Sequence, residues 1–150
     1  MSRRYGTQSF IGELGDGFLR VLGRERVRAG LYRQRSFVDR GVRLPGSSDR
    51  YVVRGAPMRG IHDAVNQRTD SLQPFVPEEA LTAAQALRAF TLDAAYASFD
   101  EDRKGSITPG KLADLVVLGA NPLEVAQDQL KDVPVKATVI GGEVVFGRLG

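Results

Sequence analysis

The chain has 150 residues, enough to bury the core of one domain, and 42% hydrophobic with 26% charged residues is an ordinary globular composition. It contains no cysteine and a single histidine, His62, which excludes disulfides, thiolate metal sites and a metal site built from several imidazoles of this chain. Residues 1–10 lack the apolar stretch of a secretory signal, and no apolar run reaches the roughly 18 residues of a membrane span. We therefore expect a cytoplasmic protein without a membrane partner.

The net charge of +3 is unevenly distributed along the chain. Residues 1–75 hold 14 arginines and 7 acidic residues (+7), whereas residues 76–150 hold 7 basic and 11 acidic residues (−4). A basic half can indicate a nucleic-acid surface, but here the arginines lack interleaved aromatic residues and no recognised binding motif is present. A solvated face, or a surface that contacts another part of the protein, is the favoured interpretation, and we expect no nucleic-acid partner.

The first part of the chain has the periodicity of helices. Apolar residues at spacings of one, three and four predict a helix over residues 10–22 that ends at Gly23. A second helical stretch is predicted from about residue 24 to residue 40, with Gly41 as its C-terminal stop.

A short candidate strand, residues 42–44, runs into the loop Pro45-Gly46-Ser47-Ser48-Asp49. A strand followed at once by small residues and an acid is typical of the strand-end loops that bear the active sites of parallel α/β proteins. The local pattern alone favours a plainer role, in which Ser48 or Asp49 caps a helix or forms an Asx turn. Both interpretations stay open at this level.

Two further helices follow this loop. Residues 57–67 form a short helix that holds His62, and a lone histidine on such a helix is expected to be a packed or surface residue. Thr82 and Gln85 have the spacing of a capping box, so a helix begins there, and it breaks near Thr91.

The last third of the chain is rich in predicted strands. Residues 107–110 form a proline-glycine turn, and residues 115–118 form a strand with the composition of a buried one. Residues 123–130 include a helical turn, and residues 136–146 form a hairpin around Gly141-Gly142.

Several of these segments, in this order, resemble a known family. GSITPGKLADLVVL (105–118), LTAAQALRAFTLDAAYAS (81–98) and KATVIGGEVVF (136–146) resemble the closing segments of amidohydrolase-superfamily enzymes. The stretch 9–49, which ends in a GSD-like motif, and PMRGIHDAVNQRT (57–69) resemble amidohydrolase family three, which includes N-substituted formamide deformylase-like enzymes.

The resemblance implies an α/β fold, the C-terminal portion of a (β/α)8 TIM barrel together with part of a small composite β-sandwich. Residues 1–103 would be the last β/α units of the barrel, and residues 104–150 the C-terminal strands of the sandwich. A whole barrel needs about 250 residues, so we expect this chain to be a fragment of a longer enzyme.

The resemblance also implies a chemistry. The family binds one or two divalent metals, usually zinc, and hydrolyses amide-type C–N bonds of small molecules. Asp49 matches the family's aspartate after the last barrel strand, which is both a metal ligand and the catalytic group that takes a proton from metal-bound water. A metal that lowers the pKa of bound water toward ~7 makes this a sound role for a nearby carboxylate.

The departures from the family pattern limit what the chain can do alone. The H-x-H motif and two later histidines have no counterpart here, and Arg50 and Tyr51 stand in the loop that the family writes as SDaPV. We therefore expect the fragment to be inactive by itself, with a homo-oligomer favoured by its unpaired strand edges. The alternative function is a non-catalytic remnant that serves as a binding or assembly module.

Overall fold

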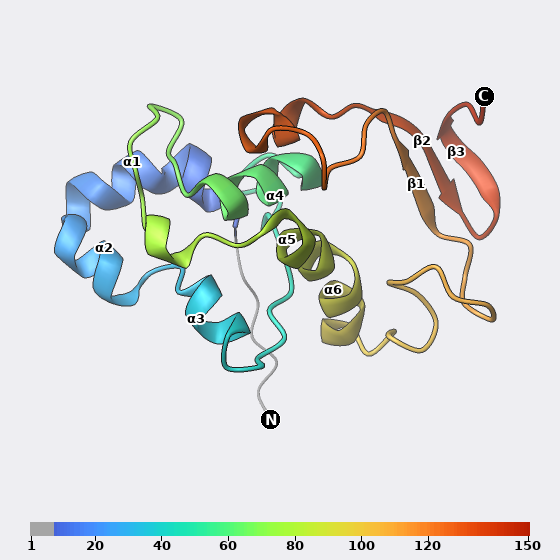
Figure 1. The fold of residues 1–150 in the computed structure, drawn as a ribbon, viewed down its shortest axis with the longest axis horizontal. Helices are drawn as coiled ribbons and strands as arrows, with labels where there is room; N and C mark the ends of the chain where they lie inside the picture. The colour runs from blue at the N-terminus through green and yellow to red at the C-terminus, as the bar shows by residue number, and fades with distance from the viewer. Residues whose placement is uncertain (1–7) are drawn as a thin grey trace.

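The structure is a computed structural model that describes residues 8–150, with helices followed by a small antiparallel sheet (Figure 1). The helices are α1 (Phe10–Leu22), α2 (Arg24–Gly30), α3 (Gln34–Val38), α4 (Pro57–Asn66), α5 (Ala83–Phe90) and α6 (Leu92–Ala97), with 3-10 helices η1 (Pro77–Glu79) and η2 (Gln127–Asp132). The strands are β1 (Leu115–Leu118), β2 (Val135–Ile140) and β3 (Glu143–Gly147). The chain is therefore a mixed α/β protein.

The first helix has the bounds that its apolar spacing predicts. It ends at Gly23, whose φ of 76° lies in the left-handed region and whose N–H donates to the Leu19 carbonyl at 3.1 Å. The single helix predicted for residues 24–40 is wrong, because α2 and α3 are separate helices. Leu31 is extended and Tyr32 has a φ of 50° at the break between them.

The packing of Tyr32 explains this break. Its ring lies 6.2 Å from the ring of Phe18 and 5.6 Å from that of Phe75, measured between centroids. The three rings close one apolar cluster, whose buried members are Ile11, Val27, Phe75 and Val76. Even partial burial of an aromatic side chain such as Tyr32 outweighs the few tenths of a kcal/mol per residue that helix propensity supplies.

Helix α4 lies at the centre of the helical part, between α1, α5 and η2 (Figure 1). It begins at Pro57, a residue favoured in the first turn, and ends at Gln67 in the left-handed conformation, close to the predicted 57–67. Its buried face forms the second core cluster with neighbouring elements: Ile61, Ala64, Val65, Leu81, Ala86 and Leu130.

The predicted capping box is confirmed at the start of α5. The Gln85 N–H donates to the Thr82 hydroxyl at 3.2 Å, and the Thr82 N–H donates to the Gln85 side-chain oxygen at 2.9 Å. The predicted break near Thr91 is also confirmed, since α5 ends before it and α6 begins after it.

The sheet has the strand order β1-β2-β3 with both pairs antiparallel. The predicted hairpin is confirmed: Gly141 and Gly142 have φ values of 58° and 90°, which a two-residue type I′ turn requires. The turn at Pro109-Gly110 is confirmed as well, with the Lys111 N–H donating to the Thr108 carbonyl at 3.1 Å. The helical turn predicted within 123–130 is confirmed at the end of this range, where η2 begins at Gln127 and continues to Asp132.

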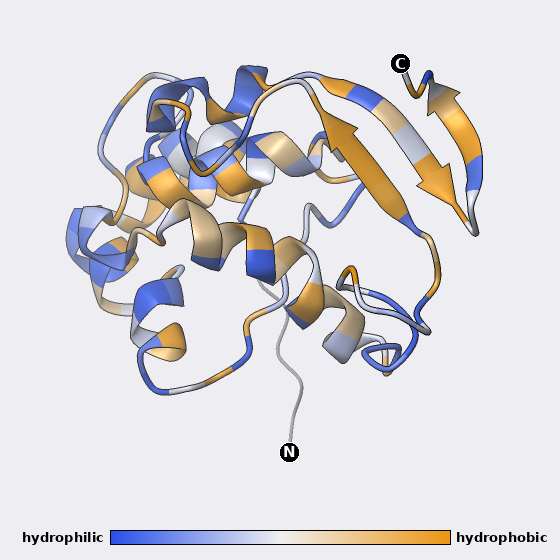
Figure 2. Ribbon diagram, turned by 45° about the vertical axis from the view of Figure 1, so that its right-hand side comes forward, coloured by the Kyte–Doolittle hydropathy of each residue, from blue (hydrophilic) through white to orange (hydrophobic). Residues whose placement is uncertain are grey.

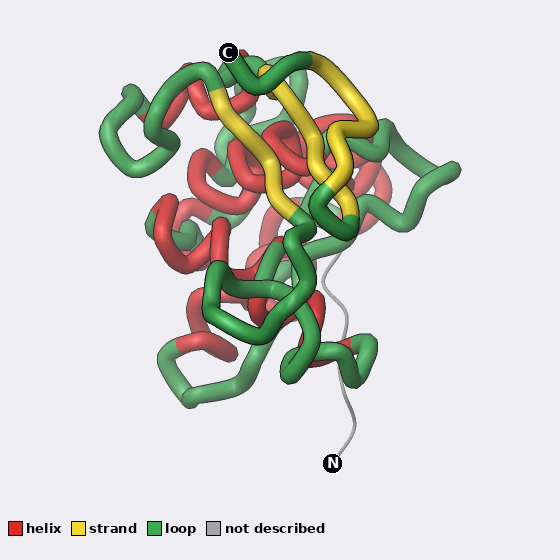
Figure 3. Tube along the Cα trace, turned by 90° about the vertical axis from the view of Figure 1, so that its right-hand side faces the viewer, coloured by secondary structure: helices red, strands yellow, loops and turns green. Residues whose placement is uncertain are grey.

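Two predictions about strands are wrong. Residues 115–118 do form a strand, but Leu115, Val116 and Val117 are exposed, because the sheet lies at one end of the molecule with strands on its outer surface (Figures 2 and 3). Residues 42–44 are not part of a sheet within the described chain, although Leu44 is buried.

The (β/α)8 barrel and the composite β-sandwich remain expectations. The three strands of residues 8–150 are antiparallel, so the described chain displays no barrel. The division at residues 103 and 104 remains a prediction. No helix within residues 8–150 is long and apolar enough to cross a membrane.

Candidate functional site

The loop that holds Asp49 joins α3 to α4, and the residues before it anchor it to the helical core. Leu44 and Pro45 are buried. The Gly46 N–H donates to the Ala89 carbonyl of α5 at 2.8 Å. A Cβ built on Gly46 would lie 2.3 Å from the ring of Phe90, so only glycine lets the loop approach α5 this closely.

Asp49 itself lies at the exposed end of this anchored loop. Its N–H donates to the Ser47 hydroxyl at 3.1 Å, and its carbonyl accepts from the Val52 N–H at 2.8 Å. Its φ of 49° is a left-handed conformation, which aspartate tolerates better than most residues. Non-glycine residues in such conformations often occur at functional sites, so this geometry is compatible with a working carboxylate.

The Asx-turn alternative is not what the hydrogen bonds show. The side chain that bonds to the backbone two residues on belongs to Ser47, and the Asp49 N–H is the donor. The carboxylate of Asp49 is on an exposed residue, where solvent or a ligand can reach it.

Residues 50–52 after Asp49 are exposed. Tyr51 is 92% exposed, and the Arg50 guanidinium lies 5.4 Å from the centroid of its ring. Val53 is buried and returns the chain to the core before α4 begins. Asp49 is therefore followed in the chain by an exposed arginine and an exposed tyrosine that contact each other.

A metal site is not complete within the described chain. No group of three or more His, Asp or Glu residues in residues 8–150 is arranged to hold an ion. Asp49 can offer one carboxylate oxygen, whereas catalytic zinc sites use three protein ligands. The prediction that Asp49 binds metal therefore stays a prediction, and a set of three protein ligands would need at least one group from outside residues 8–150.

An ionic cluster that the sequence analysis missed lies on α4. The fully buried carboxylate of Asp63 accepts from Arg59 Nε at 3.0 Å and lies 3.0 Å from His62 Nδ1. Arg59 also pairs with Asp70. Burial raises the pKa of Asp63, while His62 and Arg59 act in the opposite direction. The i,i+4 spacing of Arg59 and Asp63 was the available signal, but the spacing says nothing of burial.

The ionic cluster of Arg59, His62, Asp63 and Asp70 has a structural role. The Asp70 N–H donates to the Gly12 carbonyl at 3.0 Å, so the cluster joins α4 and the following turn to α1. His62 is a packed residue, as expected, and its neighbour in the cluster is Asp63.

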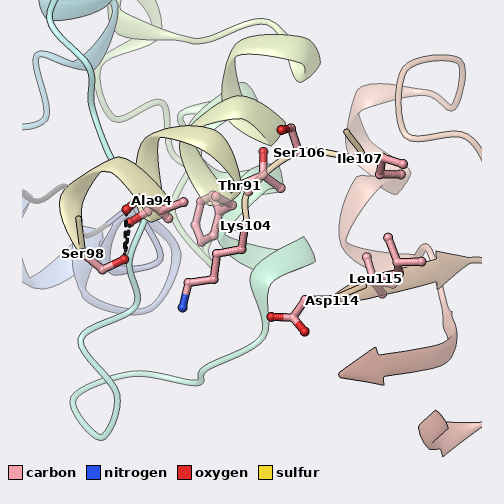
Figure 4. A pocket seen from close by; sticks show the side chains of 12 residues that line it. Thr91, Ala94, Ser98, Lys104, Ser106, Ile107, Asp114 and Leu115 are labelled. Atoms are coloured by element: carbon pink, nitrogen blue, oxygen red, sulfur yellow. Dashed lines mark hydrogen bonds between the residues drawn. The ribbon is translucent and has the colours of Figure 1, made fainter. Parts of the chain in front are cut away.

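A mostly apolar pocket of about 470 Å³ lies between α5, α6 and β1 (Figure 4). Its polar residues are engaged with neighbouring groups: Ser98 donates to the Ala95 carbonyl at 3.0 Å, and Lys104 pairs with Asp100 at 3.0 Å. The Asp114 carboxylate accepts from the Gly141 N–H at 2.8 Å. Asp49 is not among the residues that line this pocket.

Comparison with known proteins defines the class. The sequence profile of the amidohydrolase family matches residues 9–146, and the chain belongs to that family. It is similar to the N-substituted formamide deformylase of Arthrobacter pascens, with 34% identity over 91% of this chain and 25% of the enzyme. It is also similar to the protein LONG AFTER FAR-RED 3 of Arabidopsis thaliana, with 33% identity over 87% of this chain and 22% of that protein.

The fold agrees with this membership. An uncharacterized metal-dependent hydrolase from Pyrococcus horikoshii OT3 superposes with a TM-score of 0.69 at 27% identity, over 83% of this chain and 26% of that one. The chain therefore spans about a quarter of the length of these relatives. The predicted resemblance to amidohydrolase family three is confirmed.

Proposed function

We propose that this chain supplies the acid–base carboxylate, Asp49, of a metal-dependent hydrolase that cleaves an amide-type C–N bond of a small molecule. The observation that supports this is the placement of Asp49: it is exposed at the end of a loop whose preceding residues are anchored to α5. A carboxylate held in this way can accept a proton from one reacting group and return it to another, such as a leaving amine.

The proposal includes a divalent metal, zinc, with Asp49 as one ligand and the remaining ligands outside residues 8–150. A bound metal of this kind supplies a water whose pKa is lowered toward ~7. The contribution of this chain is to hold a proton at an Asp49 carboxylate oxygen and to present Arg50 and Tyr51 beside it. The isolated chain, lacking a complete ligand set among its described residues, would not turn over substrate.

A second candidate is an assembly module without catalysis. The exposed apolar side chains of the sheet favour it, among them Val116, Val145 and Phe146. Surfaces of this kind occur where another polypeptide packs.

A hybrid enzyme separates the two candidates. Residues 8–150 of this chain replace the matching segment of the Arthrobacter pascens deformylase, and hydrolysis of an N-substituted formamide is measured with bound metal. We expect an active, metal-containing hybrid in which Asp49→Asn lowers kcat by about 10²- to 10⁴-fold, the usual contribution of an acid–base group. The matched control is Asp39→Asn, an exposed carboxylate paired with Arg35, which should leave kcat unchanged.

Two results would contradict the acid–base role. One is an Asp49→Asn hybrid with full turnover. The other is a folded, metal-loaded hybrid that is inactive with Asp49 intact, which would favour the assembly module instead.

A further inference from the structure

A buried glutamine lies beneath the Asp49 loop. The side chain of Gln8 is on a residue only 1% exposed, just before α1, and its Oε1 accepts from the Ser47 N–H at 3.1 Å. The two residues are 39 positions apart in the chain. A buried amide oxygen needs a hydrogen-bond donor, because leaving it without one costs the full desolvation of the group.

The hydrogen bonds continue from this contact to the candidate catalytic residue. Gln8 fixes the backbone N–H of Ser47, and the hydroxyl of the same Ser47 accepts from the Asp49 N–H at 3.1 Å. Gly46, one residue earlier, is held separately by its bond to the Ala89 carbonyl at 2.8 Å. Asp49 therefore takes its left-handed φ of 49° at the end of a short series of bonds that starts in the core.

We propose that Gln8 is a positioning residue for Asp49, and that it acts through Ser47. This inference rests on the proposed function of Asp49. The peptide plane before Ser47 is oriented by Gln8, the Ser47 hydroxyl is thereby directed toward residue 49, and its bond to the Asp49 N–H sets the direction in which the carboxylate leaves the loop. Preorganised groups of this kind must be held within a fraction of an ångström, so the loss of one link misplaces the carboxylate.

Amide hydrogen exchange of the 150-residue chain, followed by NMR, tests the series of bonds without any catalysis. Gln8→Met keeps the side-chain volume and removes the acceptor, and we expect exchange at Ser47 and Asp49 to become about three- to tenfold faster, the effect of one lost hydrogen bond. Ser47→Ala should accelerate exchange at Asp49, and Ser47→Thr, which retains the hydroxyl, should restore it. The Gly46 N–H is the internal reference and should not change.

The matched control is Gln34→Met. Gln34 is also buried, but its Nε2 donates to the Ala64 carbonyl of α4 at 3.1 Å. A buried glutamine that matters only for general stability would change exchange at Gly46, Ser47 and Asp49 together in both variants, and that result would overturn the proposal. Faster exchange at Ser47 with no change at Asp49 would overturn it as well.

The hybrid deformylase supplies the second readout. We expect Gln8→Met to lower kcat about tenfold or more with KM unchanged, because it misplaces a reacting group and leaves the rest of the binding surface intact. An active hybrid whose kcat does not change with Gln8→Met would overturn the positioning role. If the hybrid is inactive but the amides of the 150-residue chain exchange as predicted, the function proposed for Asp49 is refuted. The series of hydrogen bonds from Gln8 to Asp49 is then upheld.

Discussion

At the scale of single residues, the ring of Phe90 determines how closely the Asp49 loop and α4 approach each other. A Cβ built on Gly60 of α4 would lie 2.4 Å from this ring and 2.7 Å from the Ser9 hydroxyl. Gly46 of the loop has the same constraint on the same ring. The ring of Phe90 thus occupies the space that two missing side chains leave between the site loop and the core helix.

We therefore expect Gly60→Ala to destabilise the chain by about 1–3 kcal/mol, the usual cost of overpacking a core. The matched control is Gly17→Ala, also within a helix, but with no atom within 4 Å of the added Cβ apart from its chain neighbours and the helix backbone. It should stabilise the chain by up to about 1 kcal/mol, because alanine is the better helix former. Urea unfolding measures both, and equal stabilisation by the two substitutions would show that Phe90 does not constrain Gly60.

The buried carboxylate of Asp63 gives a pH-dependent prediction. Burial raises its pKa in the folded chain above the ordinary value of about 3.9, although His62 and Arg59 oppose this. The folded state then binds more protons than the unfolded state between these two values. The stability that Asp63 contributes is therefore present below about pH 4 and lost as the pH rises through the raised pKa.

The measurement is the difference in unfolding free energy between the wild-type chain and Asp63→Asn across this range. We expect the wild type to lose stability relative to Asp63→Asn as the pH rises. Asp16, Glu78 and Asp100 have lowered pKa values and act in the opposite sense, but both proteins contain them, so they cancel. The comparison is repeated with His62→Gln, because His62 Nδ1 lies 3.0 Å from the Asp63 carboxylate. A difference that moves in favour of the wild type would mean that Arg59 and His62 outweigh burial.

At the scale of elements, the capping box of α5 makes its own contribution to the unfolding free energy, which a substitution at Thr82 can measure. Thr82→Ala removes the acceptor for the Gln85 N–H, and we expect a loss of about 1 kcal/mol in unfolding free energy. Thr82→Ser keeps the hydroxyl oxygen and should recover most of that loss. Thr108→Ala is the control, since that exposed hydroxyl bonds the Ser106 hydroxyl at 3.0 Å in a turn, outside every helix. Equal losses at Thr82 and Thr108 would contradict the capping role.

Elements whose ends are set by local chemistry could be predicted from the sequence. Gly23 stops α1, Thr82 and Gln85 start α5, and the glycine pair at 141–142 turns the hairpin, each through bonds within a few residues. The break at residues 31–33 could not be predicted, because it depends on the ring of Tyr32 packing against the distant Phe75. Residues 115–118 have the composition of a buried strand, yet Leu115, Val116 and Val117 are exposed.

The candidate site also has one feature that the local sequence predicts and others that depend on distant contacts. Asp49 was found because a short motif resembles a family pattern. The bond from Gln8 to Ser47 spans 39 positions, and the burial of Asp63 depends on α1 packing against α4, so neither could be read from spacing. Both features are contacts between segments far apart in the chain, which local sequence patterns do not specify.

At the scale of the whole molecule, the apolar side chains of the helices are more completely buried than those of the sheet, which lies at one end of the molecule (Figures 2 and 3). Two core clusters lie among the helices, whereas in the sheet Ala137 and Val139 of β2 are buried and the residues of β3 are all exposed. The chain spans about a quarter of its relatives, and the barrel and sandwich that their resemblance implies would need strands beyond those described here. A partly exposed apolar sheet whose edge strands are β1 and β3 is the feature of the described chain most open to association.

We therefore expect the 150-residue chain to self-associate through the β3 edge. Val145 is exposed on this strand, and Val145→Lys places a charge there, which natural edge strands use to prevent pairing. Light scattering across a range of concentrations should show the wild type as a dimer or larger, and the variant about tenfold or more weaker in association. Val21→Lys is the control, because Val21 is 76% exposed on α1, away from the sheet. A wild-type chain that stays monomeric at every concentration, or equal weakening by both lysines, would mean that the β3 edge is not the contact.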